Sequence, residues 1–107
     1  MQIQLNTDHN IEAHEGLSNH VSAVVEAALS RFGDRVTRVE VHLSDENGDK
    51  SGQDDKRCMM EVRLAGRQPI AVTHHADSVH MAIDGAVAKL ERAVETISGR
   101  SRDDRHG

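Results

Sequence analysis

Apolar and polar positions repeat with two different periods along the chain, and these periods divide it into six elements. A period of two residues predicts half-buried strands, which we place at residues 2–6, 38–43, 57–64 and 70–74. Steps of three and four residues predict amphipathic helices, which we place at residues 17–32 and 79–97. Gly33 and Gly99 stand where helix C-caps are expected, and Asp77 or Ser78 is available as an N-cap.

The elements follow in the order β-α-β-β-β-α, which predicts the α+β class. Each strand has one apolar face and each helix one apolar stripe, so we expect both helices to pack on one face of a four-stranded sheet. On the other face, we expect opposite charges to pair across strands. That face carries Arg38, Glu40, Arg57, Glu61, Arg63, Thr73 and His75. We assign residues 1–98 to one domain and residues 99–107, which contain no apolar side chain, to a disordered tail.

Charge is distributed unevenly along the 107 residues. The 13 Lys and Arg against 18 Asp and Glu give a net charge of −5, the wrong sign for an unspecialised nucleic-acid binder. However, residues 45–55 hold five acids and one Lys and form a predicted hairpin loop, whereas residues 56–75 are net basic. The single Cys cannot form an internal disulfide, and no apolar run approaches the roughly 18 residues of a membrane span. We therefore expect a cytoplasmic protein.

The exposed surface of the second predicted helix is divided by charge. At 100° per residue, Lys89, Arg92 and Arg100 share one flank. Asp84, Glu91 and Glu95 share the opposite flank. A cationic edge suits the phosphate backbone of structured RNA. The alternative is a solvated helix stabilised by ion pairs at three- and four-residue spacing. Because the chain has no Trp or Tyr to stack on bases, we do not expect sequence-specific readout of single strands.

The sequence offers no candidate residues for metal binding or catalysis. His74 and His75 are adjacent in a strand and point to opposite faces, so they cannot reach one ion. Cys58 occupies an alternate strand position that faces the predicted core. The acidic loop lacks the glycine and the final glutamate of a calcium loop. We predict no metal, no cofactor and no enzymatic activity. Gly85 costs the second helix about 1 kcal/mol relative to Ala, which indicates either a close approach by another backbone or family inheritance.

The segment from Ala82 to Arg92, with the sequence AIDGAVAKLER, resembles a motif of the ribosome hibernation promoting factors. These are also called ribosome-associated inhibitor or sigma-54 modulation proteins, and the resemblance to their short form spans about residues 1–98. It implies a fold like that of a double-stranded RNA-binding domain. It also implies docking on the small ribosomal subunit, where mRNA and tRNAs lie, and inhibition of translation under stress or in stationary phase.

The resemblance also implies roles for residues and partners. Lys89 and Arg92 occupy positions at which the family places basic residues facing rRNA, and Asp84 matches an Asp of structural role. To this RNA-binding set we add Arg100, Arg31, Arg57 and Arg63. The expected partner is the small ribosomal subunit and its rRNA, with no DNA and no membrane, and the protein is expected to be a monomer off the ribosome. The first helix carries few of the family's lysines, so a divergent paralogue acting as a protein-interaction or regulatory module is the alternative.

Overall fold

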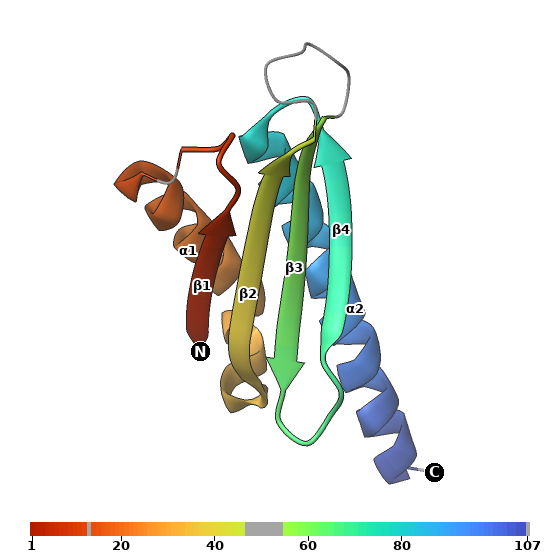
Figure 1. The fold of residues 1–107 in the computed structure, drawn as a ribbon. Helices are drawn as coiled ribbons and strands as arrows, with labels where there is room; N and C mark the ends of the chain where they lie inside the picture. The colour runs from red at the N-terminus through yellow and green to blue at the C-terminus, as the bar shows by residue number, and fades with distance from the viewer. Residues whose placement is uncertain (13, 47–54, 107) are drawn as a thin grey trace.

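The computed structural model describes residues 1–12, 14–46 and 55–106, and for residues 98–106 it describes the backbone only. Four strands, two α-helices and one 3₁₀ helix follow one another along the chain (Figure 1). They are β1 (Gln2–Thr7), α1 (Glu15–Leu29), η1 (Ser30–Arg35), β2 (Val36–Asp45), β3 (Lys56–Leu64), β4 (Ile70–Ala76) and α2 (Val79–His106). The predicted order is therefore confirmed.

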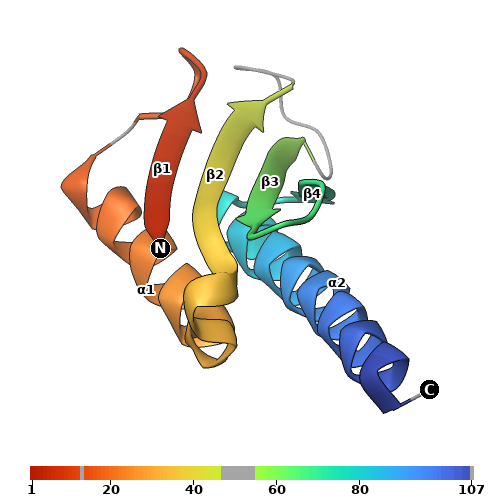
Figure 2. The same ribbon diagram turned by 90° about the horizontal axis from the view of Figure 1, so that it is seen from below.

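The four strands form one mixed sheet in the order β1-β2-β3-β4. β1 runs parallel to β2, whereas β2, β3 and β4 are antiparallel neighbours. Both helices cover the same face of the sheet, as Figure 2 shows from below. This confirms the α+β class and the two-layer arrangement. Because α1 follows β1 and α2 follows β4, and both strands finish at the same end of the sheet, the two helices begin at this end, near Asp45 of β2 and Lys56 of β3 (Figure 1).

The core lies between the helices and the inner face of the sheet. Its most buried members come from every layer, with no exposed surface on Val41 of β2, Met60 of β3, Val21 of α1 and Ile83 of α2. These side chains occupy the alternate strand positions and the three- and four-residue helix positions at which the sequence is apolar. Removal of this aliphatic surface from water is the main stabilising contribution to the fold.

The helix ends differ from the sequence prediction. α1 stops at Leu29 and continues as η1, in which Gly33 turns the chain with a φ of 59°. α2 does not stop at Gly99 but continues to His106, so the backbone of the predicted disordered tail is helical. A glycine in a helix interior costs only about 1 kcal/mol, which is too little to end a helix without a proline or a competing cap. The domain boundary at residue 98 stays a prediction.

The ion pairs on the outer face of the sheet also differ from those predicted from the sequence. β2 contains an irregularity between Val36 and Arg38, and beyond it Arg38 lies opposite Arg63 and Glu40 opposite Glu61. Charges of the same sign therefore face each other at these two positions, and the predicted cross-strand pairing is wrong there. Two ion pairs run along the strands instead, from Arg38 to Glu40 at 2.9 Å and from Arg63 to Glu61 at 3.7 Å. Across the strands, Arg57 reaches the carboxylate of Glu46, beside the neighbouring strand, at 3.8 Å.

Candidate nucleic-acid interface

α2 presents two exposed flanks on either side of its buried stripe. The helix begins after Ser78, whose hydroxyl oxygen accepts a hydrogen bond from the backbone N–H of Met81, so Ser78 is the N-cap that the sequence left open. Ile83 and Leu90 turn into the core. One flank then faces α1 and the other faces β4, because α2 packs beside both elements. The two flanks carry opposite charge.

The acidic flank, formed by Asp84, Glu91 and Glu95, faces α1 and η1. Arg31 of η1 reaches both glutamates, with its Nη2 atom 3.3 Å from Glu91 Oε2 and 3.4 Å from Glu95 Oε2. His20 of α1 lies with its Nε2 atom 3.5 Å from Asp84 Oδ1, although the nitrogen is buried without a well-oriented hydrogen bond. The charge of Arg31 is therefore largely compensated, and this residue lies on the side of α2 away from Lys89.

The cationic flank, formed by Lys89 and Arg92, faces β4. The Lys89 ammonium donates a 2.9 Å hydrogen bond to the backbone carbonyl oxygen of Thr73. This acceptor is neutral, so the full positive charge of Lys89 remains uncompensated. Arg92 is exposed one turn further along, and no carboxylate pairs with it within the described ranges. The two residues present two uncompensated cations on one helical edge, as a phosphate backbone requires.

The other predicted cations lie elsewhere. Arg57 and Arg63 project from the outer face of the sheet, and each is close to a carboxylate: Arg57 Nε lies 3.8 Å from Glu46 Oε1, and Arg63 Nε lies 3.7 Å from Glu61 Oε1. The backbone of Arg100 continues α2 beyond Arg92. The structure thus brings Lys89 and Arg92 together and separates Arg31, Arg57 and Arg63 from them.

One uncompensated cation was missed by the sequence analysis. Arg35 ends η1, is exposed, and has no carboxylate partner in the part of the chain that the structure describes. Its backbone carbonyl accepts a hydrogen bond from the N–H of Ala65, which places it at the same end of the sheet as the β3–β4 turn. The signal in the sequence was its position in the polar segment 33–35, between the last apolar residue of the first predicted helix and the strand that follows.

The position of α2 on β4 depends on a histidine and a glycine. His74 occupies an inward position of β4, opposite the buried Cys58 of β3. Its ring fills the space beside Gly85 so closely that a Cβ atom there would collide with the ring. The close approach inferred from the sequence is therefore real, but it comes from a side chain and not from a backbone. It lets α2 lie near enough to β4 for Lys89 to reach Thr73.

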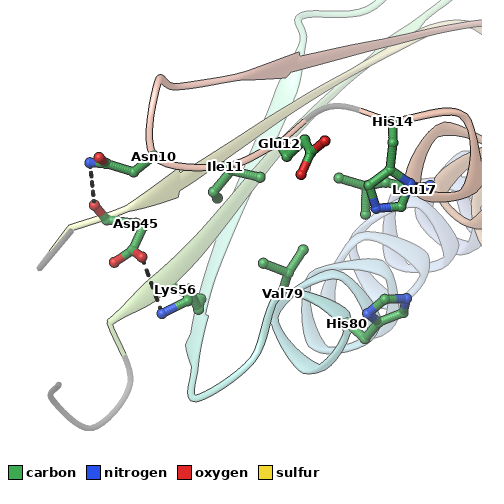
Figure 3. Close-up of a pocket in the computed structure, with 9 residues that line it drawn as sticks. All are labelled: Asn10, Ile11, Glu12, His14, Leu17, Asp45, Lys56, Val79 and His80. Atoms are coloured by element: carbon green, nitrogen blue, oxygen red, sulfur yellow. Dashed lines mark hydrogen bonds and ion pairs between the residues drawn. The ribbon is translucent and has the colours of Figure 1, made fainter. Parts of the chain in front are cut away.

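A pocket of about 250 Å³ lies at the end of the sheet where both helices begin, and Figure 3 shows its lining. Its cation, Lys56, is held by Asp45 at 3.3 Å and by Asp55 at 3.0 Å. The hydrogen bond with Asp55, reinforced by Asp45, raises the pKa of Lys56. Asn10 closes the cluster by donating to the backbone carbonyl oxygen of Asp45 at 3.4 Å. Because its charge is already paired, this pocket is a poor site for a phosphate.

Metal binding and nucleophilic chemistry gain no support from the geometry. No three side chains of His, Cys, Asp or Glu gather into a metal-binding group among the described residues. Cys58 is fully buried, and this burial raises the pKa of its thiol to about 12, so the thiolate needed for reactivity is not formed at neutral pH. Within the same residues, no helix is both long and apolar enough to cross a membrane. Residues 47–54 of the acidic loop lie outside the described residues.

Known proteins share both the sequence pattern and the fold. Residues 5–102 match the family model described as sigma 54 modulation protein / S30EA ribosomal protein. The crystal structure of the Thermus thermophilus Protein Y N-terminal domain is similar, with 28% sequence identity, a TM-score of 0.73, and coverage of 91% of this chain and 99% of that chain.

A ribosomal subunit interface protein from Coxiella burnetii shares the fold at 15% identity and a TM-score of 0.75, over 92% of this chain and 99% of that chain. No curated protein matches the chain. The family match extends over nearly the whole described fold, including the cationic flank of α2. The chain belongs to the sigma 54 modulation protein / S30EA ribosomal protein family.

Proposed function

We propose that this protein is a non-enzymatic ribosome-binding inhibitor of translation. It binds the rRNA of the small subunit in the channel used by mRNA and tRNAs, and it acts in stressed or stationary cells. Family membership and the likeness to Protein Y and to a ribosomal subunit interface protein support ribosome binding. The alternative is a protein-interaction module that has kept the fold without binding the ribosome.

The cationic flank carries this proposal. Lys89 has only a neutral acceptor, and Arg92 has no carboxylate partner among the described residues. In contrast, Arg31, Arg57 and Arg63 are each within 4 Å of a carboxylate. Affinity for structured RNA comes mainly from phosphate neutralisation, so cations without internal partners contribute most. The flank supplies this contribution even though the net charge of the chain is −5.

Co-sedimentation with purified small subunits over a series of salt concentrations tests the proposal. The variant with Lys89→Gln and Arg92→Gln should bind at least tenfold more weakly than the wild type. Each lost phosphate contact removes roughly 0.9 from the slope of log affinity against log salt, so the slope should fall by close to 2. Addition of mRNA and initiator tRNA should displace the wild-type protein, and the wild type should inhibit translation in a reconstituted system.

A matched control is the variant with Arg57→Gln and Arg63→Gln, which removes the same charge from paired positions. It should bind nearly as well as the wild type. Equal losses in the two variants would show that overall charge, and not the flank, governs binding. A wild-type protein that does not sediment with small subunits at moderate salt would contradict the proposal and favour the protein-interaction alternative.

A further inference from the structure

Two contacts join α2 to β4 close to Lys89. One is the hydrogen bond of 2.9 Å that the Lys89 ammonium donates to the backbone carbonyl oxygen of Thr73. The other is the packing of the His74 ring on Gly85, which is so close that a Cβ atom at Gly85 would collide with the ring. Thr73 and His74 are consecutive in β4, and Gly85 and Lys89 lie about one turn apart in α2. Two adjacent strand residues therefore meet one turn of the helix.

The two contacts use different groups of the strand. His74 lies opposite the fully buried Cys58 of β3, so its side chain is on the face of the sheet that the helices cover. Thr73 contributes a backbone carbonyl oxygen at the edge of β4, which is the last strand of the sheet. Because a strand and a helix turn are both stiff, a movement of α2 away from β4 changes the two contacts together.

The His74 ring sets how closely α2 approaches β4. On this side of the helix the neighbouring side chains are small, since Ala82 and Ala86 flank Gly85 and have no exposed surface. The spacing therefore depends on what the strand places against them, which beside Gly85 is the half-buried ring of His74. Protein interiors are close-packed, so removal of the ring leaves a void that the helix partly fills by moving.

The hydrogen bond of Lys89 depends on that spacing. It is a single bond at the surface, and a lysine side chain loses much rotamer freedom when it is held in one place. The net contribution of one such bond is small, and the bond weakens steeply once its geometry is lost. The packing of His74 on Gly85 is therefore needed to keep the Lys89 ammonium beside Thr73 in the unbound protein.

We infer that His74 is a positioning residue for the rRNA binding proposed above, and that it acts through Lys89. The ring fixes the spacing between α2 and β4, and this spacing fixes where the Lys89 ammonium meets a phosphate. Phosphate contacts set the placement of a protein on a nucleic acid, and a group that is already in place loses less freedom on binding. The effect on binding rests on the proposed function, whereas the placement of Lys89 by His74 does not.

Carbon-13 relaxation of the lysine ε-methylene groups tests the placement without any RNA. In the wild type, the Lys89 methylene should be restrained. In His74→Ala, and in Gly85→Ala, which pushes against the ring from the helix side, it should become as mobile as in a free lysine. Lys56 is an internal reference, because two carboxylates hold it and it should stay restrained throughout. The control variant is Val24→Ala, which removes partly buried packing from α1 and should lower the urea midpoint without releasing Lys89.

A double-mutant cycle tests the effect on binding to purified small subunits. His74→Ala should weaken binding several-fold and lower the salt slope by up to about 1, as the loss of one phosphate contact does. In the Lys89→Gln background, the same substitution should cause no further loss. A merely structural role of the ring would lower affinity equally in both backgrounds.

The inference is overturned by such equal losses, by a His74→Ala protein that binds as the wild type does, or by a Lys89 that stays restrained in both His74→Ala and Gly85→Ala. It is also overturned if Val24→Ala releases Lys89 to the same extent. A wild-type protein that does not bind small subunits contradicts the proposed function instead, and the relaxation measurement then still decides whether His74 places Lys89.

Discussion

How much positive charge a basic side chain of this protein offers to an external anion depends on the atom that the side chain contacts. Lys89 and Arg31 have the same formal charge, but Lys89 touches a neutral carbonyl and Arg31 touches two glutamates. The sequence could place Lys89 and Arg92 on one flank, because helical periodicity is enough for that. It could not show that Arg31 lies beside Glu91, because that contact joins residues 60 positions apart.

The close packing of the His74 ring on Gly85 predicts how a substitution of the glycine changes stability. Gly85→Ala gains about 1 kcal/mol of helix propensity, but the new methyl group collides with the His74 ring. Overpacking in a dense interior typically costs about 1–3 kcal/mol, so we expect a net loss of up to about 2 kcal/mol in the free energy of unfolding. Urea denaturation followed by circular dichroism measures the change.

The control for that prediction is a double-mutant cycle with His74→Ala. Once the ring is removed, Gly85→Ala should become neutral or stabilising, and the coupling energy should exceed about 1 kcal/mol. If Gly85→Ala destabilises the His74→Ala protein as much as the wild type, then the ring is not what requires a glycine at this position.

Among the elements, the pairing of β2 with β3 is stabilised by one lysine that lies between two buried carboxylates. Asp45 and Asp55 are only 8% and 5% exposed, and Lys56 contacts both. Lys56→Met keeps the length of the side chain but removes the ammonium group that offsets these two buried negative charges, and the loss of one partner of a buried ion pair is strongly destabilising in general. We expect a clearly lower urea midpoint than for Arg63→Met, which removes an exposed pair.

The pH dependence of that difference follows from the raised pKa of Lys56. A lysine whose pKa is raised on folding stabilises the protein fully below its unfolded pKa, about 10.4, and the contribution is lost as the pH rises through the folded value. The gap in stability between the wild type and Lys56→Met should thus be constant near neutral pH and shrink at strongly alkaline pH. A gap that is unchanged at high pH would contradict the role of the ammonium charge.

Element types and their order could be predicted from the sequence, but several boundaries and the register could not. Val36 is buried at the start of β2, although it is three residues from the buried Val39 and breaks the two-residue period. The irregularity between Val36 and Arg38 causes this break and also places Arg38 opposite Arg63. Register of this kind is decided by backbone pairing between distant segments, which a local pattern does not contain.

At the scale of the whole molecule, charge is separated along the long axis of about 53 Å. The end at which both helices begin carries several acids, among them Glu12, Glu15, Asp45 and Glu46. The cationic flank lies further along α2. Separation of this kind lets a chain of net charge −5 keep a locally positive surface, which is compatible with the proposed binding to rRNA.

Neutralising the acidic end should therefore change the speed of binding. The variant with Glu12→Gln and Glu15→Gln reduces the net charge from −5 to −3 without touching the cationic flank. We expect its association rate with small subunits at low salt to rise several-fold, since repulsion from a polyanion falls. Stopped-flow measurements at high salt should show no difference, because screening removes long-range effects. A change confined to the dissociation rate would contradict this explanation.

The hydrogen bond from Lys89 to Thr73 also bears on how the protein avoids aggregation. If Lys89 binds rRNA as proposed, a phosphate would draw its ammonium away from the Thr73 carbonyl oxygen, and the ammonium would return to this acceptor when the RNA leaves. A single side chain would in this way serve ligand capture in the bound protein and cover one backbone acceptor of the β4 edge in the unbound protein, as lysines near strand edges commonly do.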